Sequence, residues 1–300
     1  MAVCFSFDNG CRPTTEATLQ TGLLPAQERQ KRRFEKAFAM FTDTHCHLAD
    51  PALLPQLPDV LAAARAANVC RFIVPATCRA DWAAVLALAA PDIHSAIGIH
   101  PWFAAEAEAD DLAALSQLLA QHPQALVGEI GLDFLHQNPS NEARARQISL
   151  FEQQLRLAEQ HRRPVIIHNL KASAAIVGAV HATRFSQGGI VHAFSGSFEE
   201  AQAFIRCGFK IGIGSLLLNP AAKKARQAAA ALPLEHIVLE TDSPFMLKHQ
   251  TNTPANVRAI AETVAGLRGL SLAALSMQTE INVTQLLAFQ TALCPSKKIT

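Results

Sequence analysis

From Met40 onward, the chain alternates between short apolar runs and longer stretches that have apolar residues at helical spacing. The runs are rich in Val and Ile, a composition typical of buried strands. They occupy 71–77, 94–100, 125–132, 163–169, 188–194, 208–214 and 235–242, and the segment 39–47 precedes them. This pattern predicts eight β-strands.

Ala- and Leu-rich stretches between these runs predict the helices. They lie at 53–67, 79–90, 109–121, 141–162, 171–182, 197–207, 219–231 and 254–268, and a last amphipathic helix at 271–290 is expected to pack outside the barrel. Strict alternation of strands and helices requires parallel strands joined by crossover helices. Eight such units over about 230 residues predict an α/β fold, the (β/α)8 TIM barrel, with an open doubly wound sheet as the alternative.

The first 39 residues lack this order. They mix turn-forming residues with a basic cluster, "RQKRRFEK", and a short amphipathic helix at 25–39 is compatible with their pattern. The basic cluster could bind phosphate, although a solvated helix face is the more common use of such a run. The expected organisation is an N-terminal extension at 1–39, flexible or preceding a true start at Met40, and a single domain at 40–292.

Composition restricts the classes of partner. The formal net charge of the 300 residues is +1, so any attraction to phosphate has to be local. The seven cysteines are scattered without a CxxC pair, which indicates reduced thiols in the cytoplasm rather than disulfides. No apolar run is long enough to cross a bilayer and the N-terminus lacks a signal pattern, so the cytoplasm is the expected location.

Ionisable residues gather where the predicted strands end. They are His45, His47, His100, Glu129, His168, His192, Glu240 and Asp242. The carboxyl ends of barrel strands form the rim where TIM-barrel enzymes place their catalytic groups. Buried ionisable groups are costly unless they are paired or bind a metal. On an extended segment His45 and His47 point to the same side, so they can hold one ion together.

Six motifs carry a family resemblance. In chain order they are "FTDTHCHL", "AIGIHP", "VGEIGLDF", "RPVIIH", "VHAFSGS" and "LETDSPF". With them the chain resembles the TatD family of metal-dependent hydrolases, and within it the YjjV-like branch. The resemblance implies a (β/α)8 barrel and metal-dependent deoxyribonuclease activity. It further implies two divalent metal ions, one held by His45, His47, Glu129 and Asp242, and a second that Glu129 shares with His168 and His192.

This resemblance suggests roles for the remaining residues. Two adjacent divalent ions can activate water and stabilise the oxygens of a displacement, and Asp242 could accept the proton of that water. His100 is a candidate for contacting the scissile phosphate or protonating the leaving group, with a structural hydrogen bond as the alternative. Asp43 and Glu240 are expected to orient a ligand or the backbone behind it.

The chain departs from the family at two expected phosphate contacts. Leu170 stands where relatives commonly have Arg, and Thr251 stands where many relatives have a second Arg. Lys171, Lys248 and His249 could compensate, although Lys lacks the fork geometry of Arg. The histidine-rich ligand set suits Zn, Ni or Mn, whereas the family suggests Mg.

Three function classes follow from this site. A phosphodiesterase or deoxyribonuclease that cleaves DNA with metal-activated water is the first. A hydrolase of a C–N or ester bond in an amide, lactone or aminoacyl-tRNA is the alternative on the same scaffold. A non-catalytic metal-binding protein is the third, and it predicts gaps in the ligand set that the sequence does not show.

Overall fold

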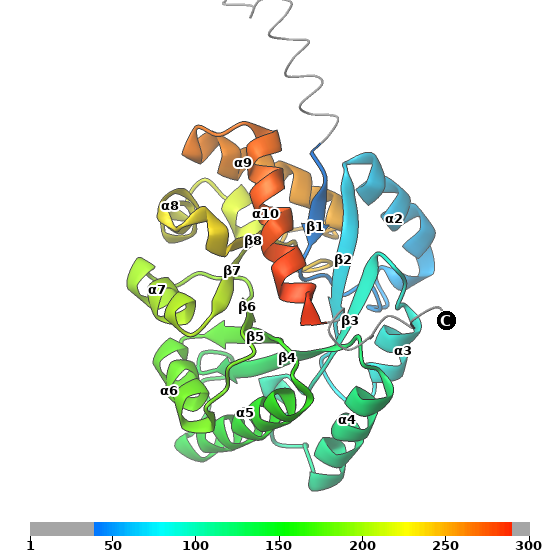
Figure 1. Ribbon diagram of the computed structural model, residues 1–300, viewed down its shortest axis with the longest axis vertical. Helices are drawn as coiled ribbons and strands as arrows, with labels where there is room; N and C mark the ends of the chain where they lie inside the picture. The colour runs from blue at the N-terminus through cyan, green and yellow to red at the C-terminus, as the bar shows by residue number, and fades with distance from the viewer. Residues whose placement is uncertain (1–38, 290–300) are drawn as a thin grey trace, which may run out of the picture.

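The computed structural model describes residues 39–289. Its strands form one eight-stranded parallel sheet in which each strand pairs with the next along the chain. They are β1 (Phe41–Asp43), β2 (Val69–Pro75), β3 (Ile93–Ile97), β4 (Leu126–Asp133), β5 (Val165–Leu170), β6 (Gly189–Val191), β7 (Phe209–Ile213) and β8 (Ile237–Leu239). Figure 1 shows these strands at the centre of the molecule with helices around them. The predicted (β/α)8 barrel is confirmed.

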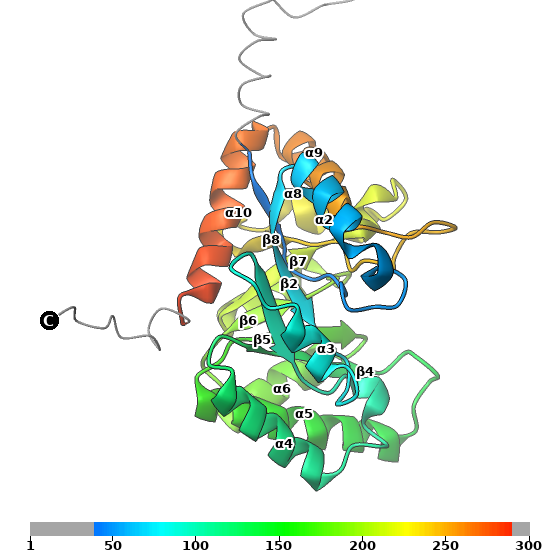
Figure 2. The same ribbon diagram turned by 90° about the vertical axis from the view of Figure 1, so that its right-hand side faces the viewer.

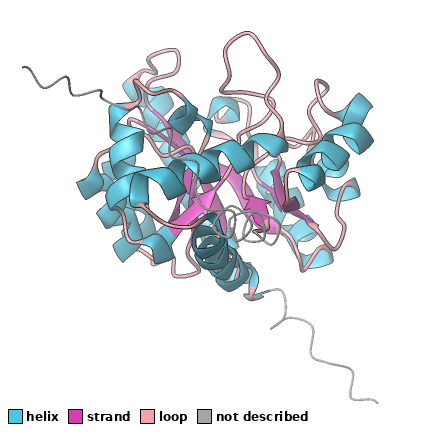
Figure 3. Cartoon of the chain, turned by 90° about the horizontal axis from the view of Figure 1, so that it is seen from above, coloured by secondary structure: helices cyan, strands magenta, loops and turns pink. Residues whose placement is uncertain are grey.

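Helices follow the strands and cover the outside of the sheet (Figure 3). The α-helices are α2 (Leu57–Ala66), α3 (Trp82–Ala87), α4 (Ala109–Gln121), α5 (Asn141–His161), α6 (Ser173–Thr183), α7 (Phe198–Arg206), α8 (Lys223–Ala231), α9 (Val257–Arg268) and α10 (Leu272–Leu287). Short 3-10 helices are η1 (Leu54–Gln56), η2 (Pro101–Phe103), η3 (Ser215–Leu218), η4 (Leu234–His236) and η5 (Pro254–Asn256). Side-chain caps that the sequence encodes begin several of them, such as Ser197, whose hydroxyl accepts from the backbone N–H of Glu200 at the start of α7.

The last helix closes one end of the barrel. Inward-facing residues near the amino ends of the strands, among them Ile166 and Val238, form a buried cluster with Val283 and Leu287 of α10. Figure 2 shows α10 on one side of the barrel, with long loops projecting from the opposite side. Because α10 covers the amino ends of the strands, the carboxyl ends are the open face, as barrel enzymes require.

The first and last strands meet at this open face. Thr44 N–H donates to the carbonyl of Leu239 at 3.0 Å, and Asp242 N–H donates to the carbonyl of His45 at 2.8 Å. These hydrogen bonds lie just beyond the ends of β1 and β8. The seam that closes the barrel therefore fixes the backbone of two candidate site residues.

Several strands end earlier than the sequence pattern predicts. Strand β6 ends at Val191 and β8 ends at Leu239, so His192, Glu240 and Asp242 follow the strands rather than belonging to them. The backbone leaves the extended conformation at Ala193 (φ 45°) and Asp242 (φ 58°). A positive φ is uncommon for non-glycine residues, and the residues that adopt it often cluster at functional sites.

The expected N-terminal extension at 1–39, including its possible helix, lies outside the described residues apart from Ala39. Within residues 39–289, no single helix is long and apolar enough to cross a membrane. Helices α9 and α10, together with η5, have the length and composition of a membrane span only when they are taken as a pair. That pair is bent by 111°.

Candidate metal centre

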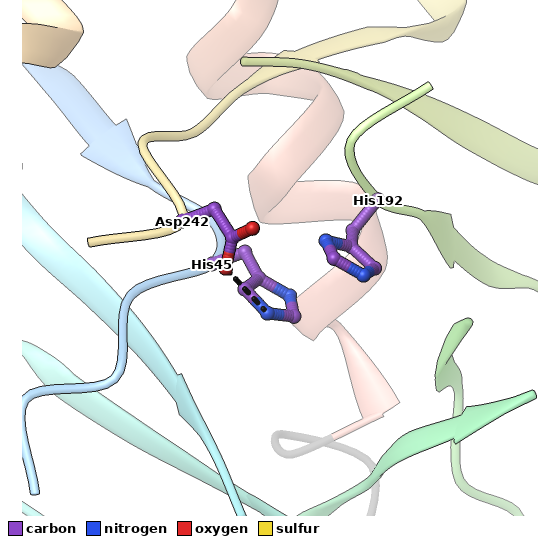
Figure 4. Close-up of side chains that lie close together, drawn as sticks. All are labelled: His45, His192 and Asp242. Atoms are coloured by element: carbon purple, nitrogen blue, oxygen red, sulfur yellow. Dashed lines mark ion pairs between the residues drawn. The ribbon is translucent and has the colours of Figure 1, made fainter. Parts of the chain in front are cut away.

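Histidine and carboxylate side chains from different strand ends converge at the open face of the barrel. His45 and His47 follow β1, and Asp242 follows β8. Figure 4 shows His45, His192 and Asp242 reaching toward one another from three separate segments. The imidazole rings of His45 and His192 stack, with centroids 3.9 Å apart. The fold thus brings together residues separated by up to about 200 positions in the sequence.

One half of the cluster surrounds the Nε2 atoms of the HxH pair. These two atoms, on His45 and His47, lie 3.2 Å apart. The Oε2 atom of Glu129 lies 3.3 Å from Nε2 of His45, and Oδ1 of Asp242 lies 3.4 Å from Nε2 of His47. Four ligands placed tetrahedrally at about 2.0–2.1 Å from an ion are separated by about 3.3–3.4 Å. The three contacts above lie close to this separation, whereas Nε2 of His45 is 3.6 Å from Oδ1 of Asp242 and Nε2 of His47 is 3.9 Å from Oε2 of Glu129. His45, His47 and Glu129 therefore form a group that could hold a metal ion, and Asp242 lies beside it.

The other half of the cluster surrounds the second carboxylate oxygen of Glu129. Its Oε1 lies 2.7 Å from Nε2 of His192 and 3.0 Å from Nδ1 of His168. The two ring nitrogens are themselves 3.3 Å apart. Each oxygen of Glu129 thus faces its own set of imidazoles, which is the arrangement expected of a carboxylate shared by two ions. Three overlapping groups in the described residues could hold a metal: His45 with His192 and Asp242, His45 with His47 and Glu129, and His100 with Glu129 and His168.

Burial and neighbouring charges set the protonation of these groups. Burial lowers the pKa of His45 to about 4, so its ring is neutral and has a lone pair for a metal. Burial also acts to lower the pKa of His192, but the charge and hydrogen bond of Glu129 outweigh it and raise the value to about 10. A cation is therefore favoured beside Glu129, and a divalent ion bound there would displace this proton.

Two buried acids support the backbone around the cluster. The carboxylate of Asp43 accepts from Thr241 N–H at 2.9 Å and from His45 N–H at 3.3 Å, and so links the ends of β1 and β8. Glu240 accepts a short hydrogen bond from the backbone N–H of Ala193, next to His192. A Cβ on Gly212 would lie 2.3 Å from Oε2 of Glu240, so only glycine leaves room for this carboxyl.

His100 lies beside the second half of the cluster. Its Nε2 is 3.4 Å from Oε1 of Glu129, and its Nδ1 accepts from the backbone N–H of Trp102 at 3.2 Å. This acceptor role of Nδ1 places the ring proton on Nε2, where it points at Glu129. Burial lowers the pKa of His100, which keeps the ring neutral. Both ring nitrogens therefore have partners within the protein.

Asp133 is a site residue that sequence analysis did not single out. Its buried Oδ2 lies 3.3 Å from Nε2 of His168 and accepts from the indole N–H of Trp102 at 2.8 Å. Its Oδ1 accepts from the backbone N–H groups of Leu135 and His136. A proton on Nε2 of His168 directs the lone pair of Nδ1 toward Glu129 and His192. The available signal was the spacing: Asp133 is four residues after Glu129 on β4, which favours the same face of a strand.

We expect Asp133→Asn to lower metal affinity or activity by roughly 10–100-fold, as loss of a group behind a metal-binding histidine does. The amide oxygen can still accept from His168, but it carries no charge. Metal titration of the purified variant, followed by an activity assay at saturating metal, measures both effects. The exposed Asp110→Asn on α4 is the matched control. Unchanged metal affinity and turnover in Asp133→Asn would contradict the role of Asp133.

A pocket of about 620 Å³ opens above the cluster. It is lined by His47, His100, Glu129, His168, His192 and Asp242, together with mainly apolar residues of the surrounding loops. The predicted phosphate contacts Lys171 and Lys248 are exposed and are not among the residues that line it. The structure does not bring these two lysines into the pocket with the other candidates.

The fold and the cluster define a TIM-barrel protein with a carboxylate–histidine site that could bind metal at the carboxyl ends of its strands. A family model described as TatD related DNase matches residues 42–288. The chain belongs to the TatD family of metal-dependent hydrolases.

Individual relatives agree with this assignment. An uncharacterized metal-dependent hydrolase of Escherichia coli, YjjV, is 37% identical over 76% of this chain and 90% of its own length. The crystal structure of YjjV superposes with a TM-score of 0.77, covering 83% of this chain and 98% of that structure. A 3'-5' ssDNA/RNA exonuclease TatD of Edwardsiella piscicida is 31% identical over 81% of this chain and 98% of its own length.

Proposed function

We propose that this metal-dependent hydrolase cleaves phosphodiester bonds of nucleic acid, most specifically of DNA. The arrangement of Glu129 carries the proposal, because its two carboxylate oxygens face two different sets of imidazoles and can serve two ions. Bound at this site, a pair of divalent ions would supply an activated water and offset charge on the phosphate oxygens. Two relatives in the same family are named 3'-5' ssDNA/RNA exonucleases, which supports a nucleic-acid substrate.

The proposed ligands follow the two halves of the cluster. His45, His47 and Asp242 would hold one ion, His168 and His192 would hold the other, and Glu129 would bridge them. Imidazoles and carboxylates together suit Zn, Mn or Ni, while Mg prefers oxygen ligands and suits the carboxylates best. Asp133, Asp43 and Glu240 would keep these ligands oriented through the hydrogen bonds described above.

Asp242 is the proposed proton acceptor. Burial acts to raise its pKa, but the hydrogen bond of His47 and the charges of His45 and His192 outweigh it and lower the value. The carboxylate therefore stays ionised and can accept a proton from a water molecule within hydrogen-bond reach. It also lines the pocket, where such a water has access to a substrate.

His100 would contact the substrate from the other half of the cluster. It lines the pocket beside Glu129, and its neutral ring carries a proton on Nε2. When a substrate displaces the contact with Glu129, that N–H could donate a hydrogen bond to a phosphate oxygen. Protonation of a leaving group would require the imidazolium form of His100, which its lowered pKa disfavours. The prediction that Lys171 and Lys248 contact phosphate applies to a substrate long enough to extend past the pocket onto the surface.

One observation favours a second candidate function, hydrolysis of a C–N or carboxylic ester bond. Among residues 39–289, those that line the pocket include no Lys or Arg, and many of them are apolar. A neutral amide or lactone needs no basic partner and would lose little binding affinity in such a pocket. A polyanion, in contrast, would lack basic side chains to pair with its charges.

A side-by-side assay separates the two functions. We expect protein reconstituted in turn with Zn, Mn, Ni and Mg to cleave single-stranded DNA or a generic phosphodiester faster than RNA and any lactone or amide. Metal-free protein treated with chelator serves as the blank. Lactone or amide hydrolysis far faster than cleavage of every phosphodiester would replace the first function with the second. No hydrolysis with any metal would favour a non-catalytic metal-binding protein.

A further inference from the structure

The large exposed aromatic rings of residues 39–289 lie in the pocket. Within residues 39–289, Trp102 and Phe245 are the large exposed aromatic side chains, at 53% and 50% exposure, and both line the pocket. Met246, 43% exposed, lines it as well. Apolar side chains exposed in one place are typical of a binding site, whereas isolated ones are ordinary surface.

The two rings flank the candidate metal centre at its two ends. Trp102 packs edge-on against His100, with ring centroids 4.8 Å apart. Phe245 packs edge-on against His47, in the other half of the cluster, with centroids 5.6 Å apart. A ligand that reaches the centre therefore passes an aromatic ring on either side.

Trp102 is held in place before any ligand binds. Its indole N–H donates to the buried carboxylate of Asp133 at 2.8 Å. One side of the ring stacks on His136, with centroids 4.4 Å apart and an interplanar angle of 28°. Trp102 lines the pocket whereas His136 does not. The part of the indole that His136 leaves uncovered is therefore the part available to a ligand in the pocket. A rigid ring loses little conformational entropy when another ring stacks on it.

The charge of the pocket restricts the ligand further. Apart from its histidines, the ionisable residues that line it are Asp50, Asp81, Glu129 and Asp242, all acidic. Charge on the substrate can therefore be offset by bound ions and by histidine, but by no Lys or Arg among the described residues that line the pocket. A phosphodiester carries one negative charge, whereas a phosphomonoester carries about 1.5–2 at neutral pH.

We infer that the pocket is a subsite for one aromatic ring, such as a nucleobase, joined to a singly charged ester that lies over the metal centre. This rests on the proposed function for the identity of the ester, but the ring subsite itself depends only on Trp102 and Phe245. The subsite selects a diester with a flanking base over a monoester or a base-free diester.

Binding measured by calorimetry tests the subsite without relying on turnover. The probes are the methyl ester of dAMP, dAMP itself, and the methyl ester of deoxyribose 5-phosphate, which has no base. We expect the methyl ester of dAMP to bind about 5–100-fold more tightly than the base-free ester, the range for stacking of one base on an aromatic side chain. It should also bind more tightly than dAMP.

Variants assign the preference to the two rings. Trp102→Ala and Phe245→Ala should each reduce the preference for the base, while Trp102→Phe should keep most of it because a ring remains. Leu135→Ala, which removes a side chain 55% exposed that does not line the pocket, should leave it unchanged. Thermal unfolding and metal content of each variant confirm that it is folded and loaded.

The outcomes distinguish this inference from the proposed function. Equal binding of the base-bearing and base-free esters, or an unchanged preference in Trp102→Ala and Phe245→Ala, overturns the subsite. A preference for dAMP over its methyl ester overturns the charge restriction. If the wild type cleaves DNA but cuts equally well beside an abasic position, the subsite fails and the nuclease stands. If it cleaves no phosphodiester yet prefers the base, the nuclease fails and the subsite stands.

Discussion

Replacing Glu129 by Ala is expected to remove metal from both halves of the cluster and to lower turnover by at least about 10³-fold. Each carboxylate oxygen faces a different set of histidines, so one substitution takes a ligand from two ions. The Lewis-acid effect of bound metal is worth several kcal/mol of transition-state stabilisation, and about 1.4 kcal/mol corresponds to tenfold in rate. Elemental analysis of the purified variant, together with its turnover number, measures both effects.

Matched variants separate this result from simple unfolding. His168→Ala should mainly empty one position, because its ring contacts only the Oε1 side of Glu129. Glu129→Gln keeps the volume of the side chain but not its charge, and it should lose metal while remaining folded. The exposed Glu199→Ala on α7 should retain full occupancy. Equal occupancy in the wild type and the Glu129→Ala variant would rule out a bridging carboxylate.

The second large effect is expected from Asp242→Asn, which should nearly abolish turnover even at saturating metal. The substitution removes a negative ligand and the proposed proton acceptor, and loss of a general base alone costs roughly 10²–10⁴-fold. Because the amide has the same shape, the hydrogen bond from the backbone N–H of residue 242 to His45 should persist and the seam of the barrel should stay closed. Single-turnover rates at rising metal concentration measure the loss.

Metal concentration distinguishes the two roles of Asp242. If the carboxylate acts only as a ligand, high metal concentration should restore turnover in Asp242→Asn. If it also accepts the proton, the rate should remain low at full occupancy. Asp59→Asn, an exposed acid on α2, is the control for a change of charge elsewhere. Turnover equal to that of the wild type would exclude Asp242 from catalysis.

The sequence by itself determined the barrel and its family. Regular alternation of Val- and Ile-rich runs with helical stretches allows few folds, because parallel strands need crossover helices. The prediction of eight strands was confirmed even though β6 and β8 are each shorter than their apolar runs. Six ordered motifs identified the TatD family, which the match over residues 42–288 confirmed.

The sequence also indicated which side chains would converge. The histidines and acids follow predicted strands, and the carboxyl ends of parallel strands meet at one rim. The structure brings these side chains into one cluster, in which Glu129 contacts His45, His168 and His192, and Asp242 contacts His47. Their assignment as metal ligands stays a prediction until metal content is measured.

Only the tertiary structure decided what surrounds the cluster. Asp133 became part of the site because the ring of His168 and the indole of Trp102 reach the same carboxylate from two other segments. Lys171 and Lys248 follow the right strands but do not line the pocket, since loops after strands point in directions that strand order does not specify. Helix α10 likewise covers the amino ends of the strands through Val283 and Leu287. Periodicity specifies which face of an element is buried, whereas the partner of that face depends on contacts between residues far apart in the chain.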